Sequence, residues 1–118
     1  MTDSNNKVKS IIYNKLEKTL NLEFYDNYKA NISAELLRVE SPSAEVQGHS
    51  SKNKNTPLNK NNIAITQIER VGNYAIRIIF DDGHDTGIYS WSYLREMSEK
   101  NIELYQNYLN RVSKISGI

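Results

Sequence analysis

The sequence predicts an α+β fold: a mostly antiparallel sheet of five to six short strands, short helical turns that close its hairpins, and one C-terminal amphipathic helix. Three observations predict it. Short alternating or β-branched segments are separated by turns that contain Asp, Asn and Gly. Two of these segments end in a serine that can cap a helix. After residue 97 the apolar residues recur at steps of three and four, which is the period of a helix.

The longest apolar run predicts the central hairpin. Residues 74–80 are rich in β-branched and aromatic residues and contain no Gly or Pro, which favours a strand. We expect Tyr74, Ile76, Ile78 and Phe80 to face the core. The segment 81–83 has the residue types of a turn. Residues 86–89 can then return antiparallel, and Ser90 can cap a short helix over 91–97.

The N-terminal part predicts a similar arrangement. Strands are expected over 8–13, 20–25 and 28–32, with a turn at Asp26-Asn27 and a helical turn over 34–38 capped by Ser33. Residues 24–38 (FYDNYKANISAELLR) echo residues 80–95 (FDDGHDTGIYSWSYLR): each has a Phe, a turn with Asp, an Ile strand, a Ser cap and a closing Leu-Arg. We interpret both as the same supersecondary unit. Ordinary propensities alone could also produce two such hairpins, and the sequence leaves this open.

The remaining segments complete a single domain. Residues 1–7 are polar and expected to be disordered. Residues 47–62 hold one large aliphatic side chain and predict a flexible loop inside the domain, which spans 8–97. Residues 63–71 alternate like a strand. A helix is expected over 98–116, with Ser98 as its cap and an apolar stripe that packs on the domain.

Composition excludes several classes of protein. The 118 residues contain no cysteine, which excludes disulfides, thiolate metal sites, cysteine-bound clusters and cysteine nucleophiles. Fifteen basic and fourteen acidic residues give no global positive charge, which argues against nucleic acid as a partner. No apolar run approaches the roughly 20 residues that span a bilayer, and the N-terminus has no signal-peptide core. We therefore expect a soluble cytoplasmic protein that does not bind membranes.

Two histidines are the candidates for chemistry. His49 and His84 each follow a glycine, and Glu45, Asp81, Asp82 and Asp85 are near them in sequence. Together they could form an oxygen and nitrogen metal site. The alternative is a turn histidine at 84 and a loop histidine at 49. Asp81 and Asp82 are explained as turn residues, since adjacent residues at a strand end point to opposite sides. The serines lack a nucleophile elbow, so the motifs predict no enzyme and no cofactor.

Two blocks carry a family resemblance: LLRVESPSAEVQGH (36–49) and VGNYAIRIIFDDGHDTGIYSWSYLR (71–95). They resemble the gamma-butyrobetaine hydroxylase-like N-terminal domain family in its free-standing bacterial form. In the eukaryotic hydroxylases this domain precedes a separate iron and 2-oxoglutarate domain, which the resemblance does not cover. It therefore implies no hydroxylation.

The resemblance also implies a lost zinc site. In those hydroxylases a Cys-x-Cys-x-x-Cys segment and a histidine in an Asp-Gly-His turn bind structural zinc. The corresponding positions here are Ser41, Ser43, Val46 and His84. Serine hydroxyls are poor zinc ligands and valine is none, so we expect no zinc. The Ser-Pro-Ser-Ala-Glu segment (41–45) and Gly48-His49 are expected to pack against the turn at His84 as a polar cluster.

These observations predict a small non-enzymatic interaction or accessory module with a protein partner, as a monomer or weak homodimer. A similar domain is appended to scaffold ATPases of iron–sulfur assembly, which suggests an adaptor in iron–sulfur or iron-enzyme systems. The alternative is a metal- or small-ligand-binding protein that uses His49 and His84. The expected interaction surface is polar and turn-rich and comprises Ser41, Ser43, Glu45, His49, Asp82, His84, Asp85, Tyr89 and Trp91.

Overall fold

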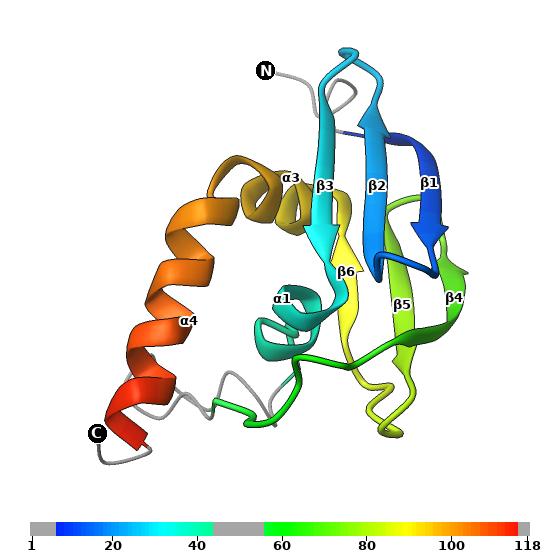
Figure 1. The fold of residues 1–118 in the computed structure, drawn as a ribbon. Helices are drawn as coiled ribbons and strands as arrows, with labels where there is room; N and C mark the ends of the chain where they lie inside the picture. Colours follow the sequence, from blue (N-terminus) through cyan, green and yellow to red (C-terminus); the bar gives the residue numbers. More distant parts are fainter. Residues whose placement is uncertain (1–6, 44–55, 116–118) are drawn as a thin grey trace.

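The computed structural model describes residues 7–43 and 56–115. Its elements, in chain order, are β1 (Val8–Asn14), β2 (Thr19–Phe24), β3 (Lys29–Ser33), α1 (Ala34–Val39), β4 (Ile65–Val71), β5 (Ala75–Phe80), β6 (Ile88–Ser90), α3 (Trp91–Glu99) and α4 (Asn101–Ile115). Figure 1 shows the strands on one side of the molecule and α4 on the other. No helix within these ranges is both long and apolar enough to cross a membrane.

The strands form two sheets, and the expectation of one sheet was wrong. Sheet A has the order β1-β2-β3 and sheet B the order β4-β5-β6, and every strand pair is antiparallel. The α+β class and the count of six short strands agree with the sequence. In each sheet a helix follows the last strand directly: β3 runs into α1 and β6 runs into α3. The two sheets meet through apolar side chains around a common core.

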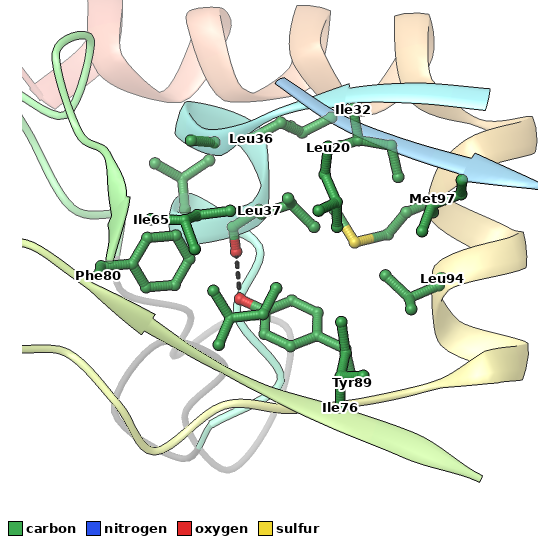
Figure 2. Packing of buried hydrophobic residues seen from close by; sticks show 14 of the residues in the cluster. Leu20, Ile32, Leu36, Leu37, Ile65, Ile76, Phe80, Tyr89, Leu94 and Met97 are labelled. Carbon is green, nitrogen blue, oxygen red and sulfur yellow. Dashed lines mark hydrogen bonds between the residues drawn. The ribbon is translucent and has the colours of Figure 1, made fainter. Parts of the chain in front are cut away.

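One hydrophobic cluster joins both sheets to the helices. Figure 2 shows Leu20 and Ile32 of sheet A close to Leu94 and Met97 of α3, with Tyr89 of sheet B beneath α1. The fully buried large side chains are Leu20, Phe24, Ile32, Leu36, Leu37, Val39, Ile78, Phe80, Tyr89, Leu94 and Met97. Burial of this apolar surface stabilises the domain by roughly 25 cal/mol per Å² removed from water. The described ranges thus have a hydrophobic core of their own.

The central hairpin differs from its predicted pattern at one position. Ile76, Ile78 and Phe80 are buried as expected, but Tyr74 is 59% exposed. Tyr74 belongs to the turn before β5, where its ring lies against Gly72, whose φ of 55° is left-handed. Ala75, on the opposite face of β5, is also buried.

The C-terminal helix also begins later than expected. Ser98 is no cap: it lies inside α3 and donates a hydrogen bond to Leu94 O at 2.7 Å. The chain turns at Lys100, and α4 starts at Asn101. The side of α4 that packs on the domain carries Leu104, Tyr105, Tyr108 and Val112, whereas Ile102 is 81% exposed. Tyr108 donates a hydrogen bond to Glu35 Oε2 of α1 at 2.8 Å, which joins α4 to the domain.

The echo in the sequence corresponds to two units with the same topology. The first unit (β1, β2, β3, α1) and the second unit (β4, β5, β6, α3) are both three-stranded meanders that end in a helix. Ser33 Oγ accepts from Leu36 N and Ser90 Oγ accepts from Tyr93 N, each at 3.1 Å. Both serines are therefore helix caps, as expected.

The two turns of the echo share the same hydrogen bonds. In the first unit, Asn27 N donates to Phe24 O at 2.9 Å and Tyr28 N to Asp26 Oδ1 at 3.2 Å. In the second unit, Gly83 N donates to Phe80 O and His84 N to Asp82 Oδ1, both at 3.0 Å. Asn27 and Gly83 have φ values of 71° and 90°, the left-handed region that Gly and Asn tolerate. His84 thus occupies the place that Tyr28 has in the first unit.

Each unit also holds the turn of the other. Arg38, at the end of α1, binds Asp82 in the second turn through Nε at 2.8 Å. Arg95, in α3, binds Asp26 in the first turn through Nη2 at 2.9 Å, and its guanidinium lies 4.1 Å from the centre of the Tyr28 ring. Two reciprocal arginine–aspartate pairs therefore link the units at their turns.

Candidate functional site

The predicted site residues come from three places in the fold. Ser41 and Ser43 follow α1, Asp82, His84 and Asp85 lie in the turn between β5 and β6, and Tyr89 and Trp91 lie in β6 and at the start of α3. Glu45 and His49, with Val46, lie outside the described residues. The structure brings Ser41, Ser43 and His84 together, although more than forty residues separate the serines from the histidine.

Two serine hydroxyls face a single nitrogen of the histidine. Ser41 Oγ lies 3.0 Å and Ser43 Oγ lies 3.4 Å from His84 Nε2, and the two hydroxyls are 3.4 Å apart. We call these three residues the serine–histidine cluster. It joins the segment after α1 to the turn after β5, as the resemblance implied for Ser41, Ser43 and His84; Glu45 and His49 of the expected cluster lie outside the described residues. Since a hydroxyl can donate or accept, the cluster is compatible with either neutral tautomer of His84.

A glycine that was not among the predicted site residues makes room for the cluster. A Cβ on Gly87 would lie 2.3 Å from Ser41 Oγ and 3.1 Å from Tyr89 Cε1. Only a residue without a side chain therefore fits between them. The sequence did contain an indication: Gly87 lies in the expected strand 86–89 and outside the turn at 81–83, and a glycine in a strand often marks a place where another segment of the chain comes close.

Tyr89 supports the cluster from the core side. Its hydroxyl donates a hydrogen bond to Leu37 O at 2.5 Å, the dashed line in Figure 2. Burial raises the pKa of the Tyr89 phenol, so it stays protonated and keeps this bond at any ordinary pH. Tyr89 is thus part of the connection between sheet B and α1.

Asp82 is the charged centre of the turn. Its carboxylate accepts hydrogen bonds from Arg38 Nε at 2.8 Å, Lys60 Nζ at 2.7 Å and His84 N at 3.0 Å. Partial burial opposes ionisation, but these three donors outweigh it and hold the pKa of Asp82 well below its usual value. Arg38 was not among the predicted site residues, although the closing Leu-Arg of the echo pointed to it.

Four of the seven described residues of the expected interaction surface are buried. Ser41 and Tyr89 are 0% exposed, Ser43 is 6% and Trp91 is 9% exposed. The reason is that their polar atoms are hydrogen-bonded inside the fold: Trp91 Nε1, for example, donates to Asn73 O at 2.7 Å. Among the described members, Asp82, His84 and Asp85 reach solvent at least partly. Of the described members, these three are the ones that a partner could touch directly.

The donor set of the cluster does not fit zinc. Structural zinc sites use thiolates and imidazoles, whereas this cluster offers one imidazole and two neutral hydroxyls. In residues 7–43 and 56–115 no three His, Cys, Asp or Glu residues lie close enough to hold a metal ion. A Ser41–His84 pair at 3.0 Å would suit a nucleophile and its base, but a fully buried hydroxyl cannot meet a substrate. The arrangement is therefore suited to holding two segments together.

Comparison with known families agrees with this architecture. The family model described as gamma-butyrobetaine hydroxylase-like, N-terminal, matches residues 11–95. The chain belongs to the gamma-butyrobetaine hydroxylase-like N-terminal family. The matched range contains both meander–helix units except for the beginning of β1 and the end of α3. The family model therefore covers the two-sheet domain and does not include α4.

Solved structures include free-standing members of similar size. One NMR solution structure shares 40% sequence identity with this chain; the match covers 95% of this chain and 83% of the other, with a TM-score of 0.81. A second NMR solution structure shares 38% identity; the match covers 93% of this chain and 86% of the other, with a TM-score of 0.76. A crystal structure from Acidithiobacillus ferrooxidans, of a protein of unknown function in the DUF971 family, shares 27% identity over 82% of this chain and 98% of its own, with a TM-score of 0.69. No curated protein matches the sequence.

Proposed function

We propose that this family member is a non-enzymatic protein-interaction module in which hydrogen bonds have taken the role of the family's structural zinc. The observation that supports a protein-interaction module is a pair of open strand edges. β1 and β4 are edge strands of sheets A and B, and Ile65 N donates a hydrogen bond to Tyr13 Oη between them at 3.1 Å. Figure 1 shows the two strands on the same side of the molecule.

A hollow separates the two edge strands beyond this contact. It has a volume of about 270 Å³ and is lined by residues of β1, β4, β5 and α3. Edge strands present unpaired backbone N–H and C=O groups, and partner segments commonly bind by adding a strand to such an edge. The seam between β1 and β4, meaning these two edges and the hollow, is our proposed binding site.

The serine–histidine cluster then has a structural task. It replaces a metal link between the segment after α1 and the second turn, and the Arg38–Asp82 pair acts beside it. Buried polar groups that are all hydrogen-bonded specify one packing of the segments they join. The cluster therefore fixes α1 against sheet B, while binding takes place at the seam.

Other expectations remain predictions. An adaptor role in iron–sulfur or iron-enzyme systems rests on the resemblance to domains appended to scaffold ATPases. A cytoplasmic location and a monomer or weak homodimer follow from composition and from the α4 stripe. The absence of catalysis is part of the proposal, and it is supported by the burial of Ser41.

Two matched substitutions on β1 test the proposed site. Val8 lines the hollow, whereas Ile12 is 63% exposed on the outer face of sheet A. Val8→Trp should fill the hollow and abolish capture of a partner from cell extract by the immobilised protein. Ile12→Trp adds the same bulk to the same strand and should leave capture intact. Equal capture by both variants, or loss with Ile12→Trp alone, would place the binding site elsewhere.

A further inference from the structure

The hollow of the seam has an apolar floor. Ile76 and Trp91 form it and are almost completely buried, while the half-buried Val8, Ile11 and Ile68 form its walls. At about 270 Å³ the hollow is smaller than the 300–1,000 Å³ typical of small-molecule pockets. It has the capacity for one or two aliphatic side chains that project from a longer ligand.

The rim of the hollow is positively charged. Lys9 and Arg70 line it from β1 and β4, both are exposed, and no acidic residue of the described ranges is among its lining. Arg70 Nε donates to Gly72 O, which leaves the terminal nitrogens of the guanidinium for other partners. Lys7 precedes β1 and is also exposed. Opposite charge on a ligand would be attracted to this rim, and Arg can bind a carboxylate with two hydrogen bonds.

The strand edges favour a peptide over a small amphiphile. The side of β1 that faces away from β2 and the side of β4 that faces away from β5 have no strand beside them in the described part of the chain. An extended peptide satisfies such backbone groups and places alternate side chains on one face. A fatty acid could fill the hollow and meet the rim, but it offers nothing to the edges.

We propose that the seam binds an extended acidic segment of a partner protein, with aliphatic side chains in the hollow and carboxylates on Lys9 and Arg70. This inference rests on the proposed function and names the chemistry of the partner at the same site. The peptide backbone pairs with the edge of β1 or β4. Its aliphatic side chains contact the apolar floor of the hollow, and its acidic side chains contact the positively charged rim.

Trp91 provides a direct readout, because it is the single tryptophan of the chain and lines the hollow. An octapeptide of alternating valine and glutamate should change its fluorescence in a saturable way and shift the NMR amide signals of β1 or β4. The same peptide with lysine in place of glutamate should bind at least tenfold more weakly. Added salt should weaken the acidic peptide's binding, since the rim charges are exposed.

Charge reversal tests the rim. Lys9→Glu with Arg70→Glu should weaken the acidic peptide at least tenfold and strengthen the lysine peptide. Lys15→Glu with Lys29→Glu, an exposed double reversal away from the hollow, is the matched control and should change neither. Equal binding of both peptides, no effect of the double reversal, or saturation by octanoate without any peptide binding would overturn the inference. If the peptides fail while Val8→Trp still abolishes partner capture, the partner chemistry is wrong and the interaction module stands.

Discussion

Gly87 gives the sharpest test of how the serine–histidine cluster is packed. Its φ is not left-handed, so an alanine there would meet no backbone strain and the cost of Gly87→Ala would be steric. The added Cβ would lie 2.3 Å from Ser41 Oγ, a contact that real Cβ atoms essentially never show. Ser41 is fully buried, so its hydroxyl cannot simply move into solvent.

The expected cost is about 2 kcal/mol, because overpacking of a buried site usually costs 1–3 kcal/mol. For a domain of this length that lowers the melting temperature by roughly 6–12 °C. Ser41→Ala removes the clashing oxygen and also loses its contact with His84, so alone it should cost about 1 kcal/mol.

A double-mutant cycle separates this explanation from a general loss of stability. The double variant Gly87→Ala with Ser41→Ala should lose less stability than the two single variants lose together, by about 1 kcal/mol or more, because the clash is gone. Chemical denaturation of the four proteins measures this directly. Strict additivity, or a Gly87→Ala protein as stable as the wild type, would refute the packing we describe.

Three further perturbations test neighbouring contacts. The lowered pKa of Asp82 stabilises the fold above the unfolded pKa of about 4, and this contribution is lost as pH falls through the folded pKa. Asp82→Asn should therefore lower the free energy of unfolding by about 1–2 kcal/mol at pH 7, and by progressively less below about pH 4. Unfolding measured over a range of acid pH tests this, and a difference between variant and wild type that does not change with pH would contradict it. Tyr108→Phe should cost about 1 kcal/mol in urea unfolding because it removes the 2.8 Å bond to Glu35, whereas Tyr105→Phe, with a 3.3 Å bond, should cost less. Arg95→Lys should lower the melting temperature by a few degrees, because an ammonium group cannot replace both the bidentate hydrogen bonds to Asp26 and the stacking on Tyr28. An unchanged melting temperature would show that the Arg95–Asp26 pair does not stabilise the fold.

Local patterns in the sequence predicted much of the fold. Each strand was found within a few residues, and both serine caps were placed correctly because a cap depends on the residues that follow it directly. The division into two sheets was missed, since strand pairing between units leaves no local pattern. Ser98 was misplaced as a cap because its residue type favours a cap, while its position inside α3 is set by the core.

The site was predicted in part. The resemblance correctly brought Ser41 and Ser43 to His84, which no spacing rule could have done across that distance in sequence. Arg38 and Gly87 were missed because their roles depend on partners from the other unit. Burial was missed for Tyr89 and Trp91, whose polar tips suggested a surface but whose hydrogen bonds are internal.

Thermal unfolding with zinc and with a chelator tests the replacement of metal by hydrogen bonds most directly. The wild-type protein should melt at the same temperature in EDTA and with two equivalents of zinc, because two hydroxyls and one imidazole offer zinc too little. A zinc-dependent rise of several degrees that saturates at one equivalent and disappears in His84→Ala would contradict the account.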